Sequence, residues 1–371
     1  MTGSFINYHH IGGRGGKFPI EIPRSMKKSI ALTLYDADSS CIEEAYKNLR
    51  KKGFLSIDVL PYCVSDKNDH DNFIITSQPH ASSMLEANPE IYGHIRNSSK
   101  FGAMRLGEIL FPYKVERVRT SSFYSIIQER DKPTPDFISL DIQGKEYDVI
   151  QASQAIFQEA LMINTEISFI PMYKGQKNFP EVHNLMSEMG FILVDLKLYD
   201  PHHLCRTPID FEGKGFLMDG EAFYIKQPYF KEWSIEKKIK YGFAAILCQQ
   251  AHLCIQLFEH WIEKGHSPFE GMGTTPTYVT LVKELYEAYK KAEKFYLPFF
   301  HHSHTYRAYH SDAPFLETPK EQPSYSEDHF IKNPYKKVLE KYGFKTFSHK
   351  IETTRKLNRR ILENFKKNDV F

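Results

Sequence analysis

Two short apolar runs in this chain each end on a carboxylate, and they are spaced like neighbouring strands of a parallel sheet. The first covers residues 136–141 and ends at Asp141, and the second covers residues 161–166 and ends at Glu166. In an open α/β sheet, the carboxyl ends of the strands border the crevice in which ligands bind. We therefore expect Asp141 and Glu166 to face one site from adjacent strands.

The surrounding sequence predicts a doubly wound sheet, because residues 5–226 alternate short β-rich runs with helical stretches. The last two predicted strands are separated by loop rather than by a helix, so this pair can be antiparallel. The predicted strands cover residues 5–11, 29–35, 56–64, 136–141, 161–166, 191–196 and 221–226, and the predicted helices cover 41–52, 145–158 and 181–189.

The rest of the chain divides into an insertion and a C-terminal region. Residues 66–130 form a long irregular connection, of the kind that often serves as a lid or binding loop. Helical periodicity starts at Ser234. We expect a domain over residues 1–230 and a helical region over 231–371. The basic tail of that region, residues 331–371, holds 12 Lys and Arg against 4 Asp and Glu, whereas the whole chain has a net charge of only +2.

The composition indicates the cellular compartment in which the protein is found. The chain has five cysteines and no CxxC pair, which argues against a disulfide framework and against a structural zinc site. It has no apolar run of about 18 residues, and its start lacks the features of a signal peptide. We expect a protein without a transmembrane segment in a reducing cytoplasm.

A glycine-rich turn and an acid follow the first two predicted strands. Such a turn lets backbone pass close to a ligand, although many glycine-rich turns are only turns. About 20 residues further, Asp36 and Ala37 stand where an acid takes the ribose hydroxyls of a dinucleotide or related cofactor. Backbone groups at the end of the third predicted strand could border the adenine ring of such a cofactor, or they could form an ordinary turn. The candidate cofactor-binding residues are Gly12, Gly13, Arg14, Gly15, Asp36, Ala37, Cys63, Val64, Ser65 and Asp141.

In this order, the motifs resemble the FkbM-type methyltransferases, which use S-adenosylmethionine to methylate hydroxyl groups. Residues 136–146 are similar to the family signature Asp-Phe-(Leu/Ile)-Lys-(Leu/Ile)-Asp-(Val/Ile)-(Glu/Gln)-Gly-Ala-Glu, with Ser139 and Lys145 as the differences. The glycine turn, the acidic end of the second strand and the segment Ser82-Ser83-Met84-Leu85-Glu86 also resemble family segments. The resemblance covers roughly residues 5–226.

The resemblance implies a Rossmann-like class I methyltransferase fold, an α/β fold with a seven-stranded, mostly parallel sheet, here with a C-terminal helical extension. It also implies S-adenosyl-L-methionine as cofactor, placed over the glycine turn and Asp36. Family members usually carry an acid two residues before the first glycine, where this chain has His10. If that acid holds the ammonium group of the cofactor, either His10 performs this task or Asp141 does.

Methyl transfer to a hydroxyl requires that the acceptor oxygen be aligned with the methyl carbon and lose its proton. Asp141 and Glu166 are the candidate catalytic residues, acting directly or through Mg2+, which prefers hard oxygen ligands. The alternative is that Asp141 only binds cofactor and Glu166 only caps a helix or loop. Glu146 lies in the first turn of the next helix, where the helix dipole favours an acid, so a structural role is predicted for it.

We predict an S-adenosylmethionine-dependent O-methyltransferase acting on a small-molecule or glycan hydroxyl, by family implication on a sugar, glycan precursor or related metabolite. A second hypothesis is a non-catalytic scaffold protein of polysaccharide assembly, in which His10 marks a degenerate cofactor site. A nicotinamide-dependent dehydrogenase is disfavoured because the third glycine of GxGxxG would fall on Lys17 or Phe18.

Three features of the C-terminal region are open to simpler explanations. The cluster His301, His302, His304 and His310 lacks a nearby cysteine, which disfavours a metal site. The basic tail carries no nucleic-acid motif, so a solvated helix face is expected and nucleic-acid binding is disfavoured. The C-terminal helices would either complete the pocket or pair two copies into a homo-oligomer.

Overall fold

The computed structural model describes residues 6–12, 20, 22–38, 41–92, 94–97, 106–199, 202–204, 215–228, 233–248 and 250, with single positions at 253, 257, 280, 284, 341 and 342. The chain divides into two compact units, Met1–Val279 and Thr280–Phe371. In the second unit, Glu284 accepts hydrogen bonds from Lys341 and Tyr342. The sheet and the candidate site lie in the first unit.

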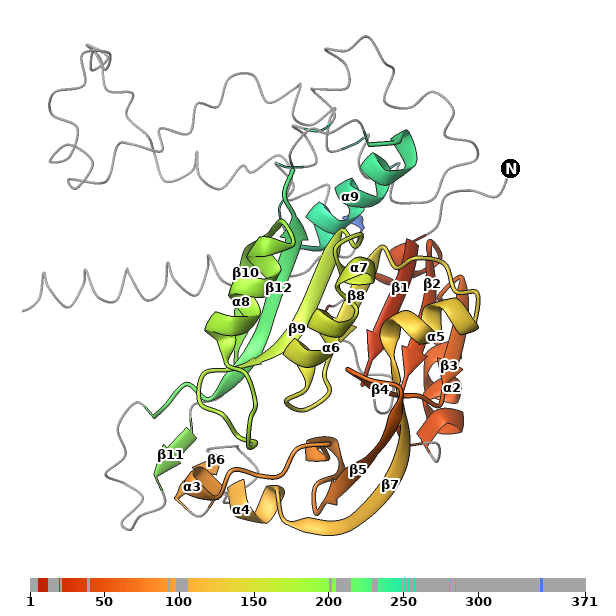
Figure 1. Cartoon of the computed structure of the whole chain (residues 1–371). Helices are drawn as coiled ribbons and strands as arrows, with labels where there is room; N and C mark the ends of the chain where they lie inside the picture. Colours follow the sequence, from red (N-terminus) through yellow and green to blue (C-terminus); the bar gives the residue numbers. More distant parts are fainter. Residues whose placement is uncertain are drawn as a thin grey trace, which may run out of the picture. The chain divides into compact units, whose positions relative to one another are not determined.

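Seven strands form the central sheet in the order β10-β12-β9-β8-β1-β2-β3 (Figure 1). The strands from β9 to β3 run parallel to their neighbours, whereas β12 runs antiparallel to β9 and β10. The predicted mostly parallel sheet and its antiparallel final pair are confirmed. The strands are β1 Ile6–Ile11, β2 Ile30–Tyr35, β3 Ser56–Leu60, β8 Phe137–Leu140, β9 Met162–Ser168, β10 Phe191–Leu198 and β12 Asp219–Lys226.

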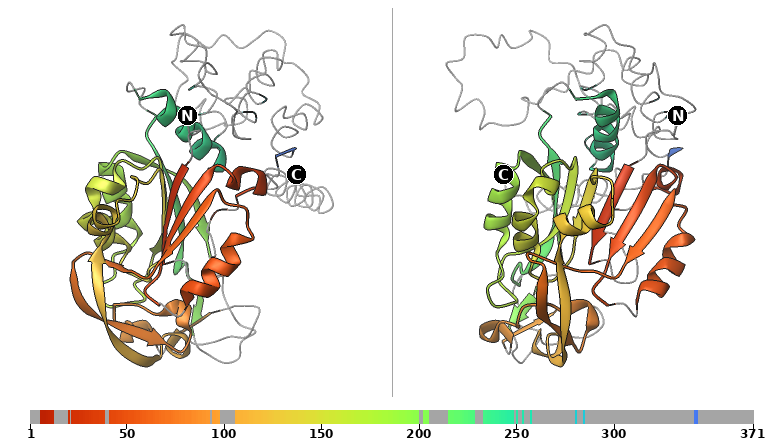
Figure 2. Two further views of the ribbon diagram at one scale, coloured as in Figure 1. Left: turned by 90° about the vertical axis from the view of Figure 1, so that its right-hand side faces the viewer. Right: turned by 45° about the vertical axis from the view of Figure 1, so that its right-hand side comes forward.

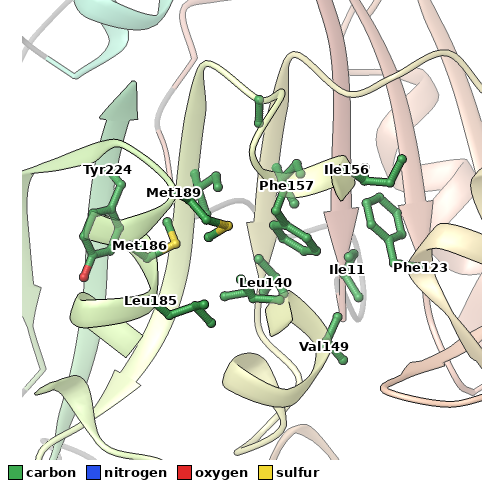
Figure 3. Close-up of a cluster of buried hydrophobic side chains, with 14 of the residues drawn as sticks. Ile11, Phe123, Leu140, Val149, Ile156, Phe157, Leu185, Met186, Met189 and Tyr224 are labelled. Carbon is green, nitrogen blue, oxygen red and sulfur yellow. The ribbon is translucent and has the colours of Figure 1, made fainter. Parts of the chain in front are cut away.

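Helices α5 to α8 cover one face of this sheet (Figure 1). Their apolar side chains and those of the strands form one buried cluster, in which Leu140 and Phe157 lie in the middle and Phe123 lies at one side (Figure 3). The helices are α1 Arg24–Lys27, α2 Ile42–Arg50, α3 Pro89–Tyr92, α4 Leu106–Ile109, α5 Phe123–Glu129, α6 Glu146–Ala152, α7 Gln154–Phe157, α8 Phe179–Glu188 and α9 Ile235–Leu247, with a 3-10 turn at Pro79–Ala81.

The single helix predicted over residues 145–158 is wrong. It is two short helices, α6 and α7, which meet at Ser153. The Ser153 hydroxyl accepts a hydrogen bond from the backbone N–H of Tyr124 at the start of α5. A serine in a helix can trade helical geometry for such a bond, so this tertiary contact explains the interruption.

The strand predicted over residues 56–64 is also wrong as one element. It divides at Pro61, which has no backbone N–H to continue a ladder. Its second part is β4 Cys63–Ser65, which belongs to another sheet, of order β4-β7-β5, with β5 Asp69–Thr76 and β7 Pro112–Ser122. The insertion predicted as irregular is therefore built largely on a long antiparallel β5–β7 ribbon (Figures 1 and 2). A short pair, β6 Ile95–Asn97 and β11 His202–Leu204, completes the described strands.

Helix α9 confirms the predicted helical extension where the chain is described, since it begins at the Ser234 cap. Phe243 stacks on Phe137 of β8 with 5.8 Å between ring centroids, and Lys240 lies 3.0 Å from the carboxylate of Asp136. α9 thus packs on the sheet unit, and the compact unit extends to Val279. The division at residue 230 stays a prediction. The histidine cluster at 301–310 and Arg355 to Arg360 lie outside the described residues.

Among the described residues, none of the helices combines the length and the apolar character that a bilayer span requires.

Replacing Phe123 with Ala tests the core. Its ring is fully buried and touches the rings of His9, Tyr35 and Phe157. Removing it should lower the free energy of unfolding by about 3–5 kcal/mol, measured by urea denaturation. Tyr124→Ala, at an exposed neighbouring side chain, is the control and should change it by less than about 1 kcal/mol. Equal effects of the two changes would contradict this packing.

Candidate active site at the carboxyl ends of the strands

A cavity of about 780 Å³ lies at the carboxyl ends of the parallel strands. Its size falls within the range of about 300–1,000 Å³ that is usual for small-molecule sites. The ends of β1, β2, β8 and β9 form one side, the insertion contributes Phe73, Ala81, Ser82 and Met84, and β10 and β12 contribute Lys197, Asp219 and Glu221. The crevice expected from the two apolar runs is thus present, with the insertion as one of its walls.

Most of the predicted cofactor-binding residues that the structure describes line this cavity. They are Gly12, Asp36, Ala37, Cys63, Val64 and Asp141. Ser65 is not among the lining residues, because its side chain is fully buried in β4 and its hydroxyl donates to Asp66. Gly13, Arg14 and Gly15 lie outside the described residues.

Gly12 is required by close backbone packing. It has a φ of +84°, and a Cβ atom at this position would lie 1.8 Å from the carbonyl oxygen of Asp141. Its N–H donates to the carbonyl of Tyr35, while the N–H of Asp141 donates to that of Ile11. The glycine therefore lets the chain leaving β1 lie against the end of β8, which brings two sides of the cavity together.

Asp36 follows β2 as a buried carboxylate at the cavity. Its Oδ1 accepts a hydrogen bond of 2.9 Å from the N–H of Asp38, which closes a local turn. The backbone N–H of Asp36 donates to Leu60 of β3. These bonds fix the carboxylate at the end of the strand, the position at which a ribose would be recognised.

Gln143 connects the two candidate catalytic carboxylates. Its Nε2 donates to Asp141 and to Glu166, each over 2.7 Å, and its Oε1 lies 3.0 Å from the hydroxyl of Tyr173. Its own carbonyl accepts a 2.6 Å bond from Ser83 of the insertion. Gln143 has a φ of +55°, which costs free energy for a residue with a side chain, and this set of bonds compensates that strain.

The acids around Gln143 carry raised pKa values. Burial, followed by the charges of Asp141, Glu146 and Asp219, raises the pKa of Glu166 well above its usual range. Burial raises the pKa of Glu146 to about 7 and that of Asp219 to about 6. A positive charge beside these acids would act in the opposite direction and lower the pKa of Glu166.

Glu146 holds the loop between β8 and α6. Its carboxylate accepts hydrogen bonds of 2.9 Å from the backbone N–H groups of Ile142 and Gly144. This geometry agrees with the structural role predicted for Glu146. Lys145, one of the differences from the family signature, lies 3.1 Å from Asp66 and 2.6 Å from Asp148, so it ties the insertion to α6.

His10 and Ser139, at two positions where this chain departs from the family pattern, are partners across β1 and β8. The Nδ1 of His10 lies 2.5 Å from the hydroxyl of Ser139, which also accepts a bond from Tyr8. The two positions at which this chain departs from the family pattern are thus joined by a hydrogen bond between their side chains.

The loop after β9 contributes two buried residues to the cavity, Met172 and Tyr173. The hydroxyl of Tyr173 lies 2.9 Å from the carbonyl of Ala81 as well as near Gln143, and it can donate to one of them at a time. Lys174 is exposed and pairs with Glu86, and Gln176 accepts bonds from the backbone of the loop itself. Of the two lining residues, Tyr173 is the one that can form a hydrogen bond with a ligand.

Sequence reasoning missed the contribution of β10 and β12. Glu221 is the register partner of Glu166 on one side and of Lys197 on the other, and all three line the cavity. The apolar residues of both strands predict the strands themselves but do not indicate that they reach the site. The signal that could have revealed the site is Asp219 and Glu221, two acids two positions apart in a strand otherwise suited to burial.

Metal ligation finds no support in the described part of the chain. No group of three or more His, Cys, Asp or Glu side chains there has the arrangement of a metal site. The magnesium ion that the sequence left open is therefore not part of the site as we describe it.

The raised pKa of Glu166 predicts how stability depends on pH. The native state keeps a proton that the unfolded chain has lost, so the free energy of unfolding should fall as pH rises above the usual glutamate pKa, by up to about 1.4 kcal/mol per pH unit for each proton. Burial lowers the pKa of His9 to about 3, so His9 opposes this trend near pH 6.5, where the unfolded histidine still binds a proton, but it does so equally in a variant of Glu166.

Glu166→Gln, which stays neutral, should show a flatter dependence than the wild type in urea denaturation at pH 6.5, 7.5 and 8.5. Parallel profiles for the two proteins would show that Glu166 titrates normally.

Comparison with solved structures finds only remote likeness. Magnesium protoporphyrin IX methyltransferase from Synechocystis PCC 6803 with bound SAM is 8% identical, with a TM-score of 0.30 over 60% of this chain and 71% of that chain. The StiE O-MT, residues 961–1257, is 12% identical, with a TM-score of 0.31 over 69% of this chain and 74% of that one. A TehB-like SAM-dependent methyltransferase from Corynebacterium glutamicum is 11% identical, with a TM-score of 0.28 over 60% and 80%.

Curated proteins give no significant match. A family model described as the methyltransferase FkbM domain matches residues 5–193, just over half of the 371 residues. The match spans the Gly12 turn, Asp36, the insertion and the strand ends that carry Asp141 and Glu166. On this match, the chain belongs to the FkbM methyltransferase domain family.

Proposed function

We propose that this chain is an S-adenosylmethionine-dependent O-methyltransferase whose acceptor is a hydroxyl of a small molecule, with sugars and glycan precursors as the acceptor class. The observation that carries the proposal is the carboxyl pair Asp141 and Glu166, which lines the cavity beside Gly12 and Asp36 and is held by Gln143. The family supplies the cofactor, and the carboxyl pair supplies a means of removing a hydroxyl proton.

The residues at the cavity fit a cationic nucleoside cofactor. Asp36 would accept from the ribose hydroxyls, and Cys63 and Val64 would border the adenine. When bound, the cofactor supplies a methyl group on a positively charged sulfur. The acids that would attract this positive sulfur gather around Glu166, and burial together with repulsion from these acids raises the pKa of Glu166.

Asp141, rather than His10, is assigned to the ammonium group of the cofactor. The Nδ1 of His10 is engaged with Ser139. Asp141 lines the cavity at the end of β8, one residue beyond the β1–β8 ladder. An ammonium group gains more from a carboxylate than from an imidazole ring, so His10 is assigned to the wall of the site.

Glu166 is the proposed general base. Positive charge beside Asp141 lowers the pKa of Glu166, because it offsets the repulsion between these acids. Glu166 then loses its proton and can accept one from an acceptor hydroxyl, while Gln143 keeps the carboxylate in place. Glu166 would therefore be able to act as a base only while the cofactor is bound.

Cofactor binding tests the first half of the proposal. Calorimetric titration with S-adenosylhomocysteine should give a micromolar dissociation constant for the wild type and at least a tenfold weaker one for Asp36→Ala. Asp195→Ala, at an exposed acid of β10, is the matched control and should bind like the wild type. A folded wild type that does not bind would overturn the proposal and favour the scaffold hypothesis.

Replacement of the base tests the second half. Glu166→Gln keeps the shape of the side chain but cannot accept the proton, so kcat should fall about 10²- to 10⁴-fold while S-adenosylhomocysteine still binds within a fewfold of wild type. The assay follows S-adenosylhomocysteine release with a panel of glycoside acceptors. A variant with wild-type kcat would show that Glu166 is not the base.

A further inference from the structure

Four polar residues form one row across the sheet at the cavity. Lys197 of β10 pairs in register with Glu221 of β12, and Glu221 pairs in register with Glu166 of β9. Leu140 of β8 pairs with Thr165, which sets Asp141 level with Glu166. Register partners point to the same side of a sheet and neighbouring strands are about 4.8 Å apart, so the row runs from Asp141 outward to Lys197.

Glu221 is buried within this row and has spare hydrogen-bonding capacity. Only 9% of its surface is exposed, and its Oε1 accepts a 2.7 Å bond from the hydroxyl of Tyr199. Among the described residues, its Oε2 has no hydrogen-bond partner, although the atom is buried and the residue lines the cavity. A buried acceptor without a donor destabilises the protein, and a ligand donor would remove this cost.

Asp219 repeats this arrangement two residues earlier on β12, and therefore on the same side of the strand. It lines the cavity, and its buried Oδ1 also lacks a partner among the described residues. The two unsatisfied oxygens thus belong to acids whose Cα atoms are about 7 Å apart along the strand. Two hydrogen-bond acceptors on the same side of one strand suit a ligand that carries several hydrogen-bond donors.

Lys197 offsets part of the negative charge of Glu221. Its Nζ lies 3.6 Å from Oε1, so a positive charge already faces this carboxylate. Oε2 therefore does not require a cationic ligand, and a hydroxyl donor can satisfy it. Removal of Lys197 would leave the surrounding acids without this positive charge and would favour a cationic ligand.

We propose that Glu221 and Asp219 form the acceptor subsite and select a polyhydroxylated acceptor, with Glu221 binding a hydroxyl next to the one that Glu166 deprotonates. The inference rests on the proposed function and deepens it. Since Glu221 is the register partner of Glu166, neighbouring hydroxyls of one ring can reach both carboxyl groups. An acceptor with a single isolated hydroxyl lacks the second donor and leaves Oε2 of Glu221 unsatisfied.

Saturation-transfer NMR on the protein saturated with S-adenosylhomocysteine tests this subsite. The probes are the methyl glycosides of glucose, galactose, mannose and fucose, and cyclohexanol represents a hydroxyl without a neighbour. At least one glycoside should bind the wild type, at least tenfold more tightly than cyclohexanol. Glu221→Gln should weaken that glycoside at least tenfold, because the amide nitrogen or oxygen can replace only one of the two carboxylate acceptors.

Two controls separate this inference from the proposed function. Glu188→Gln, at an exposed acid of α8, should bind the glycoside like the wild type. The Glu221→Gln variant should bind S-adenosylhomocysteine with a dissociation constant within twofold of the wild type, which shows that it is folded. If it does not, the Lys197→Met variant replaces it in the test. Lys197→Met should shift the binding preference of the protein from neutral glycosides toward amino sugars.

If S-adenosylhomocysteine binds but the glycosides do not, or if they bind the variant equally well, the subsite is overturned and the methyltransferase proposal stands. If S-adenosylhomocysteine fails to bind the folded wild type, both fall together.

Discussion

The site depends on the hydrogen bonds of Gln143, which hold an exposed acid, Asp141, and a half-buried one, Glu166, side by side at the cavity. The amide donates to Asp141 and Glu166, and the residue adopts a left-handed backbone conformation to do so. Its carbonyl is bound by Ser83 of the insertion, so the loop after β8, the end of β9 and the insertion all meet at this residue. Other elements position this junction: Gly12 permits the approach of β1, and Glu146 fixes the loop that carries Gln143.

A second contact joins the two positions at which this chain departs from the family pattern. His10 and Ser139 are register partners on β1 and β8, and the Nδ1 of His10 lies 2.5 Å from the hydroxyl of Ser139. The carboxylates that face the cavity are not part of this contact, so His10 by itself is weak evidence for a degenerate site.

The sheet was predictable because its strands repeat one pattern, an apolar run followed by a polar end, and this pattern is local. The break at Ser153 and the transfer of β4 to a second sheet were not, because each depends on a partner distant in sequence, Tyr124 in one case and β7 in the other. Asp141 and Glu166 could be found since each ends an apolar run: Asp141 directly follows β8, and Glu166 lies two residues before the end of β9. Glu221 could not, because its importance comes from its register with Glu166 across an antiparallel pair.

The central claim is that Glu166 is a buried carboxyl whose proton is controlled by positive charge in the cavity. Carbon-13 NMR titration of the glutamate carboxyl groups, with Glu166 assigned by comparison with Glu166→Gln, measures its pKa directly. We predict a pKa well above the usual glutamate range in the free protein and a lower one with S-adenosylmethionine bound. An ordinary pKa in the free protein, or one that does not change when the cofactor binds, would contradict this account.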